Sequence, residues 1–356
     1  MSAPRVLVCG TVLAQGLGGV QRHNRELLPR LAQRLAADGG RLAVMLGRDG
    51  LNFELPASIE RISTDVPASP ALWRAWQESG ALRDVLRRAR AIGPGFDLVH
   101  TAHLPAPRNL GVPFTLTLHD LKSVVSPFVS ISRRLVARSV LRSAVRRAAR
   151  VFCVSRTLAR ETAAFTGAGH EHLVFAPNGC DHLPLVERAS ARDPFLLFVG
   201  RLEPRKDVET LLRALALDRA LPRLVLAGTE QGRHGDELRA LARELDVLSR
   251  VDFAGPQADV PLARLYASCE SVVLPSVREG FDLPLVEALR AGAPVVASDL
   301  PVHRELAGDA VRYFTSCNPT RLVEALRERP AGTPPPLATW DDCASILVDA
   351  WRALAR

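Results

Sequence analysis

Short apolar segments alternate with longer amphipathic segments along most of the chain. The first half contains five apolar runs typical of buried strands, at residues 5–12, 42–46, 98–100, 114–118 and 151–154. Leucines spaced three to four residues apart predict a helix at 20–38, and a second long helix is predicted at 132–150. Strands that alternate with helices form parallel sheets covered by helices, so the pattern predicts an α/β fold.

The same alternation returns in the second half after a break. No clear period is found between Cys180 and Asp193, and the pattern then restarts with strands at 195–199, 224–227, 251–253, 271–274 and 294–297, helices at 208–217, 236–245, 261–267 and 284–291, and a final helix near 341–355. We therefore predict two doubly wound domains, at residues 1–185 and 193–339. Because such sheets bind ligands beside the carboxyl ends of their strands, this arrangement predicts a site in a cleft between the domains.

Composition narrows the choice of ligand. The 356 residues include 46 Lys and Arg against 38 Asp and Glu, a formal net charge of +8 that favours an anionic partner. Aromatic residues make up only 5%, which argues against a protein that stacks nucleic-acid bases on aromatic side chains. The six cysteines are too widely spaced for a zinc or redox motif, so we expect reduced cysteines in a cytoplasmic protein.

A glycine-rich segment follows the first predicted strand. Gly16, Gly18 and Gly19 precede the helix at 20–38, where backbone N–H groups and the helix dipole can approach an anion. A tight turn with positive φ explains the same glycines without any ligand. The spacing is neither G-x-G-x-x-G nor a P-loop ending in Gly-Lys-Ser or Gly-Lys-Thr, which argues against ordinary NAD and ATP sites.

Cations follow the strand at 195–199. Gly200 and Arg201 come directly after this strand, and Lys206 lies shortly before the next helix. A guanidinium and an ammonium at the carboxyl end of a parallel strand suit two phosphates of a nucleoside diphosphate. Solvated loop cations are the alternative interpretation, and the position at the end of the strand favours the binding role.

The densest group of polar residues lies between 274 and 289, where a strand, a loop and a helix follow one another. Pro284 suits the first turn of that helix, so Glu287 falls near its start, while Glu279 lies in the preceding loop. An ionised carboxylate near a helix start can accept hydrogen bonds from two vicinal hydroxyls, such as those of a ribose. Taken singly, either glutamate could instead be a solvated residue or a partner of the helix dipole.

Taken together, these residues resemble the retaining GT-B glycosyltransferases of family 4. The resemblance covers most of the chain in the family's order and includes an E-x7-E motif from Glu279 to Glu287. It implies a GT-B fold, in which two Rossmann-like domains face each other across a cleft and the helix at 340–356 packs back on the first domain. The other matching residues are Gly18-Gly19-Val20, Asn24, Leu27, His119-Asp120, Ser155, Asn178-Gly179, Asp181, Gly200-Arg201, Lys206, Gly280-Phe281, Leu283-Pro284, Ala288, Gly292, Pro294-Val295 and Ser298.

In that family the second domain holds the nucleotide sugar. The resemblance assigns Arg201 and Lys206 to the diphosphate. It assigns Glu287 to the ribose and Glu279 to the reacting donor sugar. Asp282 departs from the family, which usually has glycine there, and its side chain is expected where hydroxyls of the donor sugar approach. The loop residues expected at the donor are Gly280, Phe281, Asp282 and Leu283.

The first domain of the family mainly receives the acceptor. The resemblance places the amides of Gly18 and Gly19 at the donor phosphates and places His119 beside the reacting sugar. A hydrogen-bonded pair with Asp120 is the functional interpretation of His119, and a core histidine is the alternative. The segments 100–103 and 170–172 each carry two histidines without further ligands at fixed spacing, so no metal site is predicted.

The resemblance implies transfer of a hexose from a nucleotide diphosphate sugar, with retention of anomeric configuration and without a metal or other cofactor. Residues 298–306 resemble the corresponding segment of many mannosyltransferases in the family, which makes GDP-mannose the first expected donor and a UDP-sugar the second. The expected acceptor is a glycan, a polysaccharide or a lipid-linked sugar. A non-catalytic protein that binds nucleotide sugars or glycans with the same fold is the alternative. No nucleic-acid partner is expected, because no nucleic-acid-binding module is recognisable.

The helix predicted at 132–150 is basic and amphipathic. It carries seven arginines together with apolar residues, among them Leu135, Val136 and Leu141. Such helices bind anionic lipid surfaces, so peripheral contact with the inner face of the membrane is one expectation, and a solvated basic face is the other. No apolar run approaches the ~20 residues needed to span a bilayer.

Overall fold

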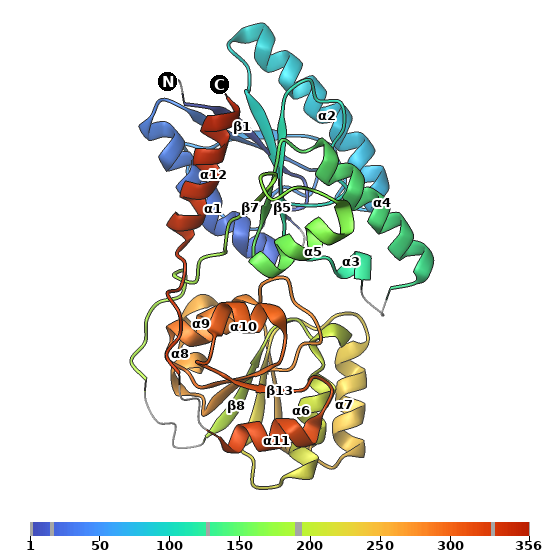
Figure 1. Ribbon diagram of the computed structural model, residues 1–356, viewed down its shortest axis with the longest axis vertical. Coiled ribbons are helices and arrows are strands. Elements are labelled where there is room, and N and C mark those ends of the chain that lie inside the picture. The colour runs from blue at the N-terminus through green and yellow to red at the C-terminus, as the bar shows by residue number, and fades with distance from the viewer. Residues whose placement is uncertain (1–2, 15–17, 126–128, 189–193, 329–331, 356) are drawn as a thin grey trace. The chain divides into compact units, whose positions relative to one another are not determined.

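The computed structural model describes residues 3–14, 18–125, 129–188, 194–328 and 332–355, and it divides the chain into two compact units. Unit 1 consists of residues 1–179 and 339–356, and unit 2 consists of residues 180–338. Each unit contains a parallel sheet with helices on both faces (Figure 1). The predicted fold class, two Rossmann-like α/β sheets, is therefore confirmed. Residues 180–185, which the sequence pattern assigns to the first domain, belong to unit 2.

Unit 1 is built on a seven-stranded parallel sheet with the strand order β3-β2-β1-β4-β5-β6-β7. The central strands are almost completely buried because helices cover both faces of the sheet. The edge strand β3 instead alternates between half-buried and exposed residues. The strands are β1 Arg5–Gly10, β2 Arg41–Leu46, β3 Glu60–Ser63, β4 Leu98–Thr101, β5 Phe114–Leu118, β6 Arg150–Cys153 and β7 Leu173–Phe175.

The helices of unit 1 include the last helix of the chain. They are α1 Gly19–Ala37, α2 Ala71–Ile92, α3 Lys122–Val125, α4 Ile131–Arg147, α5 Arg156–Thr166 and α12 Trp340–Leu354. Helix α12 lies along α1 (Figure 1), and ion pairs join Arg34 to Asp341 at 3.0 Å and Arg352 to Asp38.

A capping box starts α12. The hydroxyl of Thr339 accepts a hydrogen bond from the amide of Asp342 at 3.1 Å, and the carboxylate of Asp342 accepts one from the amide of Thr339 at 2.8 Å. These two bonds satisfy amides that the first turn of a helix leaves without partners. The buried side of the helix carries the fully buried Trp340 and Trp351, which anchor it to unit 1.

Unit 2 is built on a six-stranded parallel sheet with the strand order β10-β9-β8-β11-β12-β13. Its strands are β8 Phe195–Val199, β9 Arg223–Ala227, β10 Val251–Gly255, β11 Ser271–Leu274, β12 Val295–Ser298 and β13 Arg312–Phe314. Its helices are α6 Val208–Leu217, α7 His234–Glu244, α8 Asp259–Ser268, α9 Leu283–Arg290, α10 Pro301–Ala307 and α11 Pro319–Arg327, with short 3₁₀ turns η1 Pro204–Lys206 and η2 Leu248–Arg250.

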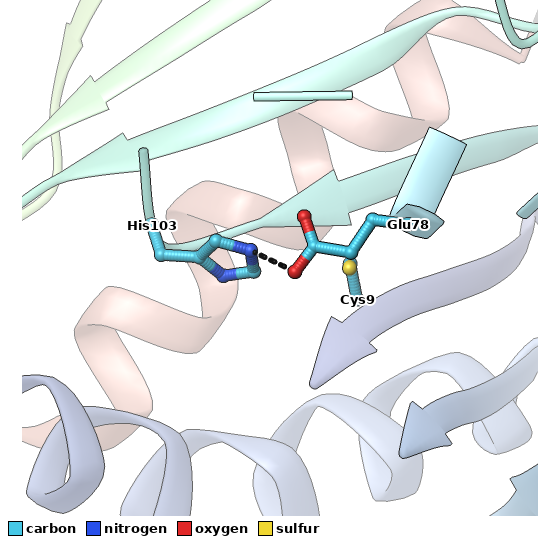
Figure 2. A group of neighbouring side chains, drawn as sticks. All are labelled: Cys9, Glu78 and His103. Carbon is cyan, nitrogen blue, oxygen red and sulfur yellow. Dashed lines mark hydrogen bonds and ion pairs between the residues drawn. The ribbon is translucent and has the colours of Figure 1, made fainter. Parts of the chain in front are cut away.

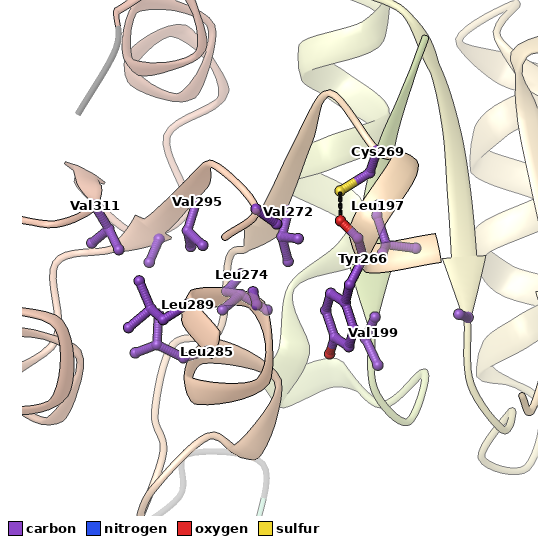
Figure 3. Packing of buried hydrophobic residues seen from close by; sticks show 14 of the residues in the cluster. Leu197, Val199, Tyr266, Cys269, Val272, Leu274, Leu285, Leu289, Val295 and Val311 are labelled. Atoms are coloured by element: carbon purple, nitrogen blue, oxygen red, sulfur yellow. Dashed lines mark hydrogen bonds between the residues drawn. The ribbon is translucent and has the colours of Figure 1, made fainter. Parts of the chain in front are cut away.

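An aliphatic core fills one face of the unit 2 sheet. Leu197, Val272 and Val295 on neighbouring strands pack against Leu285 of α9 and Tyr266 of α8 (Figure 3). All five side chains are almost fully buried. This packing holds α9 against the sheet, with the start of the helix at the carboxyl edge where the predicted site residues lie.

The helices give no sign of a membrane-spanning segment. Among the described residues, none of them combines the length and the apolar character that crossing a bilayer requires.

Candidate functional site

The predicted donor residues of unit 2 gather at one point of its sheet. Strand β8 leads to β9 on one side, whereas β11 leads to β12 on the other, so the carboxyl ends of β8 and β11 form the topological switch point of the sheet. Ligands of doubly wound folds bind at such points. The loop after β8 carries Arg201 and Lys206, and the loop after β11 carries Glu279 and Asp282.

Lys206 is the centre of this group. Its ammonium lies 2.8 Å from a carboxylate oxygen of Glu279 and 3.0 Å from one of Asp282, and only 8% of its side chain is exposed. Gly200 has a φ of +149°, and a Cβ there would lie 3.3 Å from Cε of Lys206. A glycine is therefore needed both for its backbone and for the passage of this lysine side chain. Burial opposes the charge on Lys206, but the two carboxylates raise its pKa, so the ammonium stays protonated.

Arg205 joins the two loops, a role that the sequence analysis missed. Its guanidinium contacts Glu279 at 2.6 Å and Glu203 at 2.5 Å, and it donates to the backbone carbonyl of Arg278 at 2.8 Å. In return, the amide of Val277 donates to the carbonyl of Arg205 at 3.0 Å. These contacts orient the Glu279 carboxylate from two sides and fix the spacing of the loops.

Asp282 lies deeper than the sequence suggested. Its carboxylate is fully buried, with one oxygen 3.0 Å from the Lys206 ammonium and the other 3.0 Å from Nε2 of His303 on α10. Burial opposes ionisation, but Lys206 and His303 lower the pKa of Asp282 far below its ordinary value. Its φ of 76° is in the left-handed region that favours glycine. Whether hydroxyls of the donor sugar approach this side chain stays a prediction.

Glu287 is held by partners from two other segments. The Tyr266 hydroxyl donates to one carboxylate oxygen at 2.7 Å, and Nε2 of His182 lies 3.0 Å from the other. Burial and the Glu287 carboxylate raise the pKa of Tyr266 well above its ordinary value, so its O–H remains a donor. Glu287 lies on the buried side of α9, which begins at Leu283 and has Pro284 in its first turn, as expected. His182 carried no periodic or motif signal of its own.

The remaining predicted donor residues surround this group. Arg201 is half-buried and lies two residues beyond the end of β8. Gly280 and Phe281 are buried in the loop between Glu279 and α9, and Leu283 is the half-buried first residue of that helix. The donor residues predicted in unit 2 therefore occupy two adjacent loops and one helix start.

The unit 1 candidates lie at the carboxyl ends of β1 and β5. Gly18 and Gly19 are exposed at the start of α1, and a Cβ at position 19 would meet no atom within 4 Å. Packing within unit 1 therefore does not require glycine at position 19. Gly16, the first glycine of this segment, falls outside the described residues.

His119 does not form the expected hydrogen bond with Asp120. The carboxylate of Asp120 instead accepts from the amide of Lys122 at 3.0 Å, which satisfies the start of α3. The buried Nε2 atom of His119 has no hydrogen-bond partner among the described residues. The His119 ring packs edge-on against the ring of His23 at 4.6 Å, and Nδ1 of His23 bonds to Oδ1 of Asn178 at 2.8 Å. His119 thus belongs to a histidine cluster rather than to a His–Asp pair.

Burial keeps this cluster neutral. Burial lowers the pKa of His23 to about 4, although the hydrogen bond to Asn178 acts in the opposite direction. Burial, together with the neighbouring His23 and His103, lowers the pKa of His100 to about 3. Burial, followed by the imidazoles of His23 and His100, also lowers the pKa of His119 well below its ordinary value. A neutral imidazole can accept or donate a single hydrogen bond, which suits contact with a sugar hydroxyl.

These shifts predict that unit 1 loses stability in mild acid. A histidine whose pKa is depressed in the folded protein binds its proton more readily in the unfolded chain. Its contribution to the free energy of unfolding is therefore present above about pH 6.5 and is lost as the pH falls toward the folded pKa. Between pH 7 and pH 5 we expect the unfolding free energy to fall by about 2 kcal/mol for each of His23 and His100. Urea unfolding at the two pH values measures this loss. His23→Gln should remove about 2 kcal/mol of this loss, whereas replacement of the exposed His170 should leave it unchanged.

A second buried cluster in unit 1 was not predicted. Glu78 of α2 lies 3.0 Å from Nε2 of His103 (Figure 2). Glu78 also lies 3.0 Å from the Arg74 guanidinium and accepts a hydrogen bond from the hydroxyl of Thr11. Burial opposes ionisation of Glu78, but His103, Arg74 and Thr11 together lower its pKa. Cys9 completes the only group of three potential metal ligands among the described residues. The Arg74 guanidinium already neutralises the carboxylate, so this cluster is better suited to joining α2 to β1 than to holding a cation.

The sequence was compared with known families and proteins. Residues 17–183 match the family described as Glycosyltransferase Family 4, and residues 186–329 match the family described as Glycosyl transferases group 1. A D-inositol 3-phosphate glycosyltransferase of Nocardia farcinica is 30% identical over 252 residues, which cover 61% of this chain and 54% of the relative. This chain thus spans about half the length of that relative. The O-antigen chain mannosyltransferase RfbU of Salmonella typhimurium is 23% identical over 262 residues, covering 73% and 70% of the two chains.

Solved structures show the same fold. Sucrose-phosphate synthase from Thermosynechococcus elongatus aligns with a TM-score of 0.73 at 20% identity, covering 99% of this chain and 94% of the other. Anabaena HepE in complex with UDP-glucose aligns with a TM-score of 0.67 at 19% identity, with coverage of 99% and 94%. At this level of identity the likeness concerns the fold alone.

Proposed function

The chain belongs to the glycosyltransferases of group 1 and family 4, and on that premise we propose that it transfers a hexose from a nucleotide diphosphate sugar to a hydroxyl of a glycan or glycolipid, with retention of anomeric configuration. The observation that carries the proposal is the ion cluster at the switch point of unit 2. There Lys206 is oriented by the first glutamate of the E-x7-E motif, and the second glutamate is fixed on α9 by Tyr266.

Each part of this cluster has a role toward the donor. Lys206 and Arg201 supply positive charge for the diphosphate, and Glu287 keeps lone pairs for the ribose hydroxyls beyond its bonds to Tyr266 and His182. Glu279, oriented by Arg205 and Lys206, contacts the donor sugar and offsets the positive charge that develops at its anomeric carbon. In unit 1, the amides of Gly18 and Gly19 bind the donor phosphates, and neutral His119 bonds to the reacting sugar.

The reaction that fits these residues is a front-face displacement. The acceptor oxygen forms a bond to the anomeric carbon on the face from which the diphosphate departs, and the departing phosphate oxygen takes the acceptor proton. No nucleophile of the protein is needed. Arg201, Lys206 and the Gly18 and Gly19 amides stabilise the charge that grows on the leaving phosphate.

Mannose is the proposed sugar, with GDP-mannose as the first donor and a UDP-sugar as the second. The mannosyltransferase relative supports the first choice. A thermal-shift screen across GDP- and UDP-sugars identifies the donor, because a ligand at 100 times its dissociation constant adds about 2.7 kcal/mol to stability. Slow hydrolysis of that donor in the absence of an acceptor shows a transferase. Binding without any turnover, with acceptor glycans supplied, would support a non-catalytic binding protein instead.

We expect turnover to survive the removal of divalent metal. The sequence contains no D-x-D triplet of the kind that holds a metal-bound diphosphate, and Arg201 with Lys206 supplies positive charge in its place. Donor turnover should therefore stay within about twofold after EDTA treatment. Complete loss of activity that manganese or magnesium restores would contradict the proposed role of the two cations.

Helix α4 supports the proposal of peripheral membrane contact. Its buried side carries Leu141, Ala144 and Val145, whereas Ile131, Leu135 and Val136 in its first two turns are 52–68% exposed. Residues 121–160 contain no acidic side chain, so these exposed apolar residues lie in a purely basic segment. This combination suits the surface of an anionic bilayer.

Co-sedimentation with vesicles tests this contact. We expect binding to vesicles that contain anionic phospholipid and much less binding to zwitterionic ones. Serine at positions 131, 135 and 136 should reduce binding at least about fivefold, since each buried methylene contributes about 0.8 kcal/mol. Leu217 of α6 is 61% exposed in unit 2, and Leu217→Ser is the matched control. Equal binding of both variants would contradict the role of α4.

A further inference from the structure

A line of buried polar groups runs from α10 to Lys206. Nδ1 of His303 lies 2.8 Å from the carbonyl oxygen of Ser298, and its Nε2 lies 3.0 Å from one oxygen of Asp282. The other oxygen of Asp282 accepts from the Lys206 ammonium at 3.0 Å, which in turn lies 2.8 Å from Glu279. The side chains of His303 and Asp282 are fully buried, so water cannot supply missing partners.

The geometry at His303 requires two protons on its ring. A carbonyl oxygen can only accept, so Nδ1 must carry a hydrogen that it donates to Ser298. A neutral ring would then present the lone pair of Nε2 to a carboxylate oxygen, and neither atom could donate. A proton must therefore lie between Nε2 and Asp282. Because the Lys206 ammonium bonds to the same carboxylate, the ionised carboxylate and the imidazolium form the favoured pair.

The charges that face His303 support the same assignment. Asp282 at the start of α9, Glu279 in the loop before it and Asp299 at the start of its own segment are acidic, whereas Lys206 on η1 is basic. Burial works against protonation, but Asp282, the Ser298 carbonyl and Glu279 raise the pKa of His303.

The imidazolium changes the charge that a donor meets. Lys206 faces two carboxylates, Glu279 and Asp282, so these three groups alone carry a net negative charge that would repel a diphosphate. The positive charge of His303 brings the four groups to neutrality. Arg205 and Glu203 cancel each other, so they leave this balance unchanged. Without the imidazolium, one carboxylate charge would remain in surplus beside the Lys206 ammonium.

We propose that His303 is a buried, permanently charged imidazolium that neutralises Asp282 and thereby keeps the positive charge of Lys206 available to the donor diphosphate. The proposal rests on the proposed function. His303 and Asp282 act as positioning residues, because they reach the diphosphate only through Lys206. The backbone at Asp282 has a conformation that favours glycine, so a side chain at this position carries a conformational cost. The ion pairs of its carboxylate with Lys206 and His303 offset this cost.

Nitrogen NMR of the ligand-free protein tests the charge directly. In protein labelled with ¹⁵N-histidine, the signals of His303 are assigned by their absence in His303→Gln. At about pH 7.5, one unit above the ordinary histidine pKa of about 6.5, we expect both ring nitrogens of His303 to carry protons. In Asp282→Asn the ring should be neutral at that pH. A neutral His303 ring in the wild type would overturn the proposal.

Diphosphate binding tests the consequence. GDP and UDP are each titrated into the protein in a calorimeter. Guanosine and uridine are titrated in the same way to measure the binding of the nucleoside part alone. His303→Gln leaves Asp282 uncompensated, so the affinity for the diphosphate should fall about tenfold or more while nucleoside binding stays the same. Adding Asp282→Asn to His303→Gln removes the surplus charge and should restore most of the lost affinity. A merely structural role predicts that the double variant binds no better than His303→Gln.

The outcomes separate this inference from the proposed function. If neither diphosphate binds the wild type, the proposed function is contradicted, and the NMR spectra still decide the charge of His303. If a diphosphate binds the wild type and the second substitution brings no recovery, only the inference fails. Circular dichroism of each variant confirms that binding is compared between folded proteins.

Discussion

Replacing Glu279 by glutamine is expected to lower turnover about a hundredfold while the donor KM changes only a few-fold. The carboxylate is 8% exposed and is held by Arg205 at 2.6 Å and by Lys206 at 2.8 Å, so its direction is fixed before the donor arrives. A fixed negative charge beside the anomeric carbon matters most when positive charge develops there. Its loss therefore raises the barrier more than it weakens ground-state binding.

Glu287→Gln supplies the contrast. A contact to ribose hydroxyls is made equally in the ground state and the transition state, so this variant should raise the donor KM about tenfold and leave turnover nearly unchanged. Glutamine is chosen at both positions because alanine would leave buried partners such as Tyr266 and His182 without an acceptor. Initial rates over a range of donor concentrations decide between the roles.

The exposed Glu270, at the amino end of β11, provides the control for the loss of one carboxylate from unit 2. Glu270→Gln should match the wild type in both kinetic constants. Wild-type turnover in Glu279→Gln would refute its proposed part in the reaction. An unchanged donor KM in Glu287→Gln would likewise refute the ribose contact.

The central parallel strands were predictable from sequence because both faces of each are covered. The predicted strands at 114–118, 195–199 and 271–274 coincide with β5, β8 and β11, and the run 195–199 is continuously apolar, as is typical of a strand buried on both sides. The edge strands β7 Leu173–Phe175 and β13 Arg312–Phe314 were not predicted, and the edge strand β3 was missed for the opposite reason. Its residues Glu60 to Ser63 alternate between half-buried and exposed positions and include two charged side chains.

Helix α2 was missed because the polarity of its first half is inverted, although Leu82 and Leu86 are buried in its second half. Arg74 and Glu78 lie on its buried side, whereas Trp73 and Trp76 stack on each other at its surface, 51% and 68% exposed. A search for a buried apolar stripe cannot find such a helix. Its buried pair is stable only because His103 and Thr11, from distant segments, complete the hydrogen bonds of Glu78.

The donor loops illustrate what sequence spacing can and cannot give. The order of Lys206, Glu279 and Glu287 along the chain was enough to place them at one edge of a sheet. Which cation pairs with which carboxylate depends on burial and side-chain direction, so the links made by Arg205 and His303 were not predictable. The same holds for the pairing of Asp282, whose fully buried carboxylate lies between Lys206 and His303.

Replacement of Trp351 by alanine is expected to reduce the stability of unit 1 by about 3–5 kcal/mol, a large share of the roughly 5–15 kcal/mol that holds a typical domain folded. Trp351 is fully buried on α12, its indole N–H donates to the hydroxyl of Thr115 on β5 at 3.0 Å, and its ring lies 5.3 Å from that of His100. Alanine would leave a cavity between the last helix and the central sheet, and it would remove one of the two hydrogen bonds of the Thr115 hydroxyl, which keeps its bond to Nδ1 of His100 at 2.9 Å.

Tryptophan fluorescence during urea unfolding measures this loss selectively, because all four tryptophans lie in unit 1. Trp76→Ala is the matched control: it removes the same indole from an exposed position and should shift the unfolding free energy by no more than about 0.5 kcal/mol. The loss of unfolding free energy in Trp351→Phe should lie between the losses in these two variants, since phenylalanine keeps most of the apolar ring but lacks the N–H donor. If Trp351→Ala and Trp76→Ala unfold at the same urea concentration, then α12 does not hold unit 1 together through this side chain.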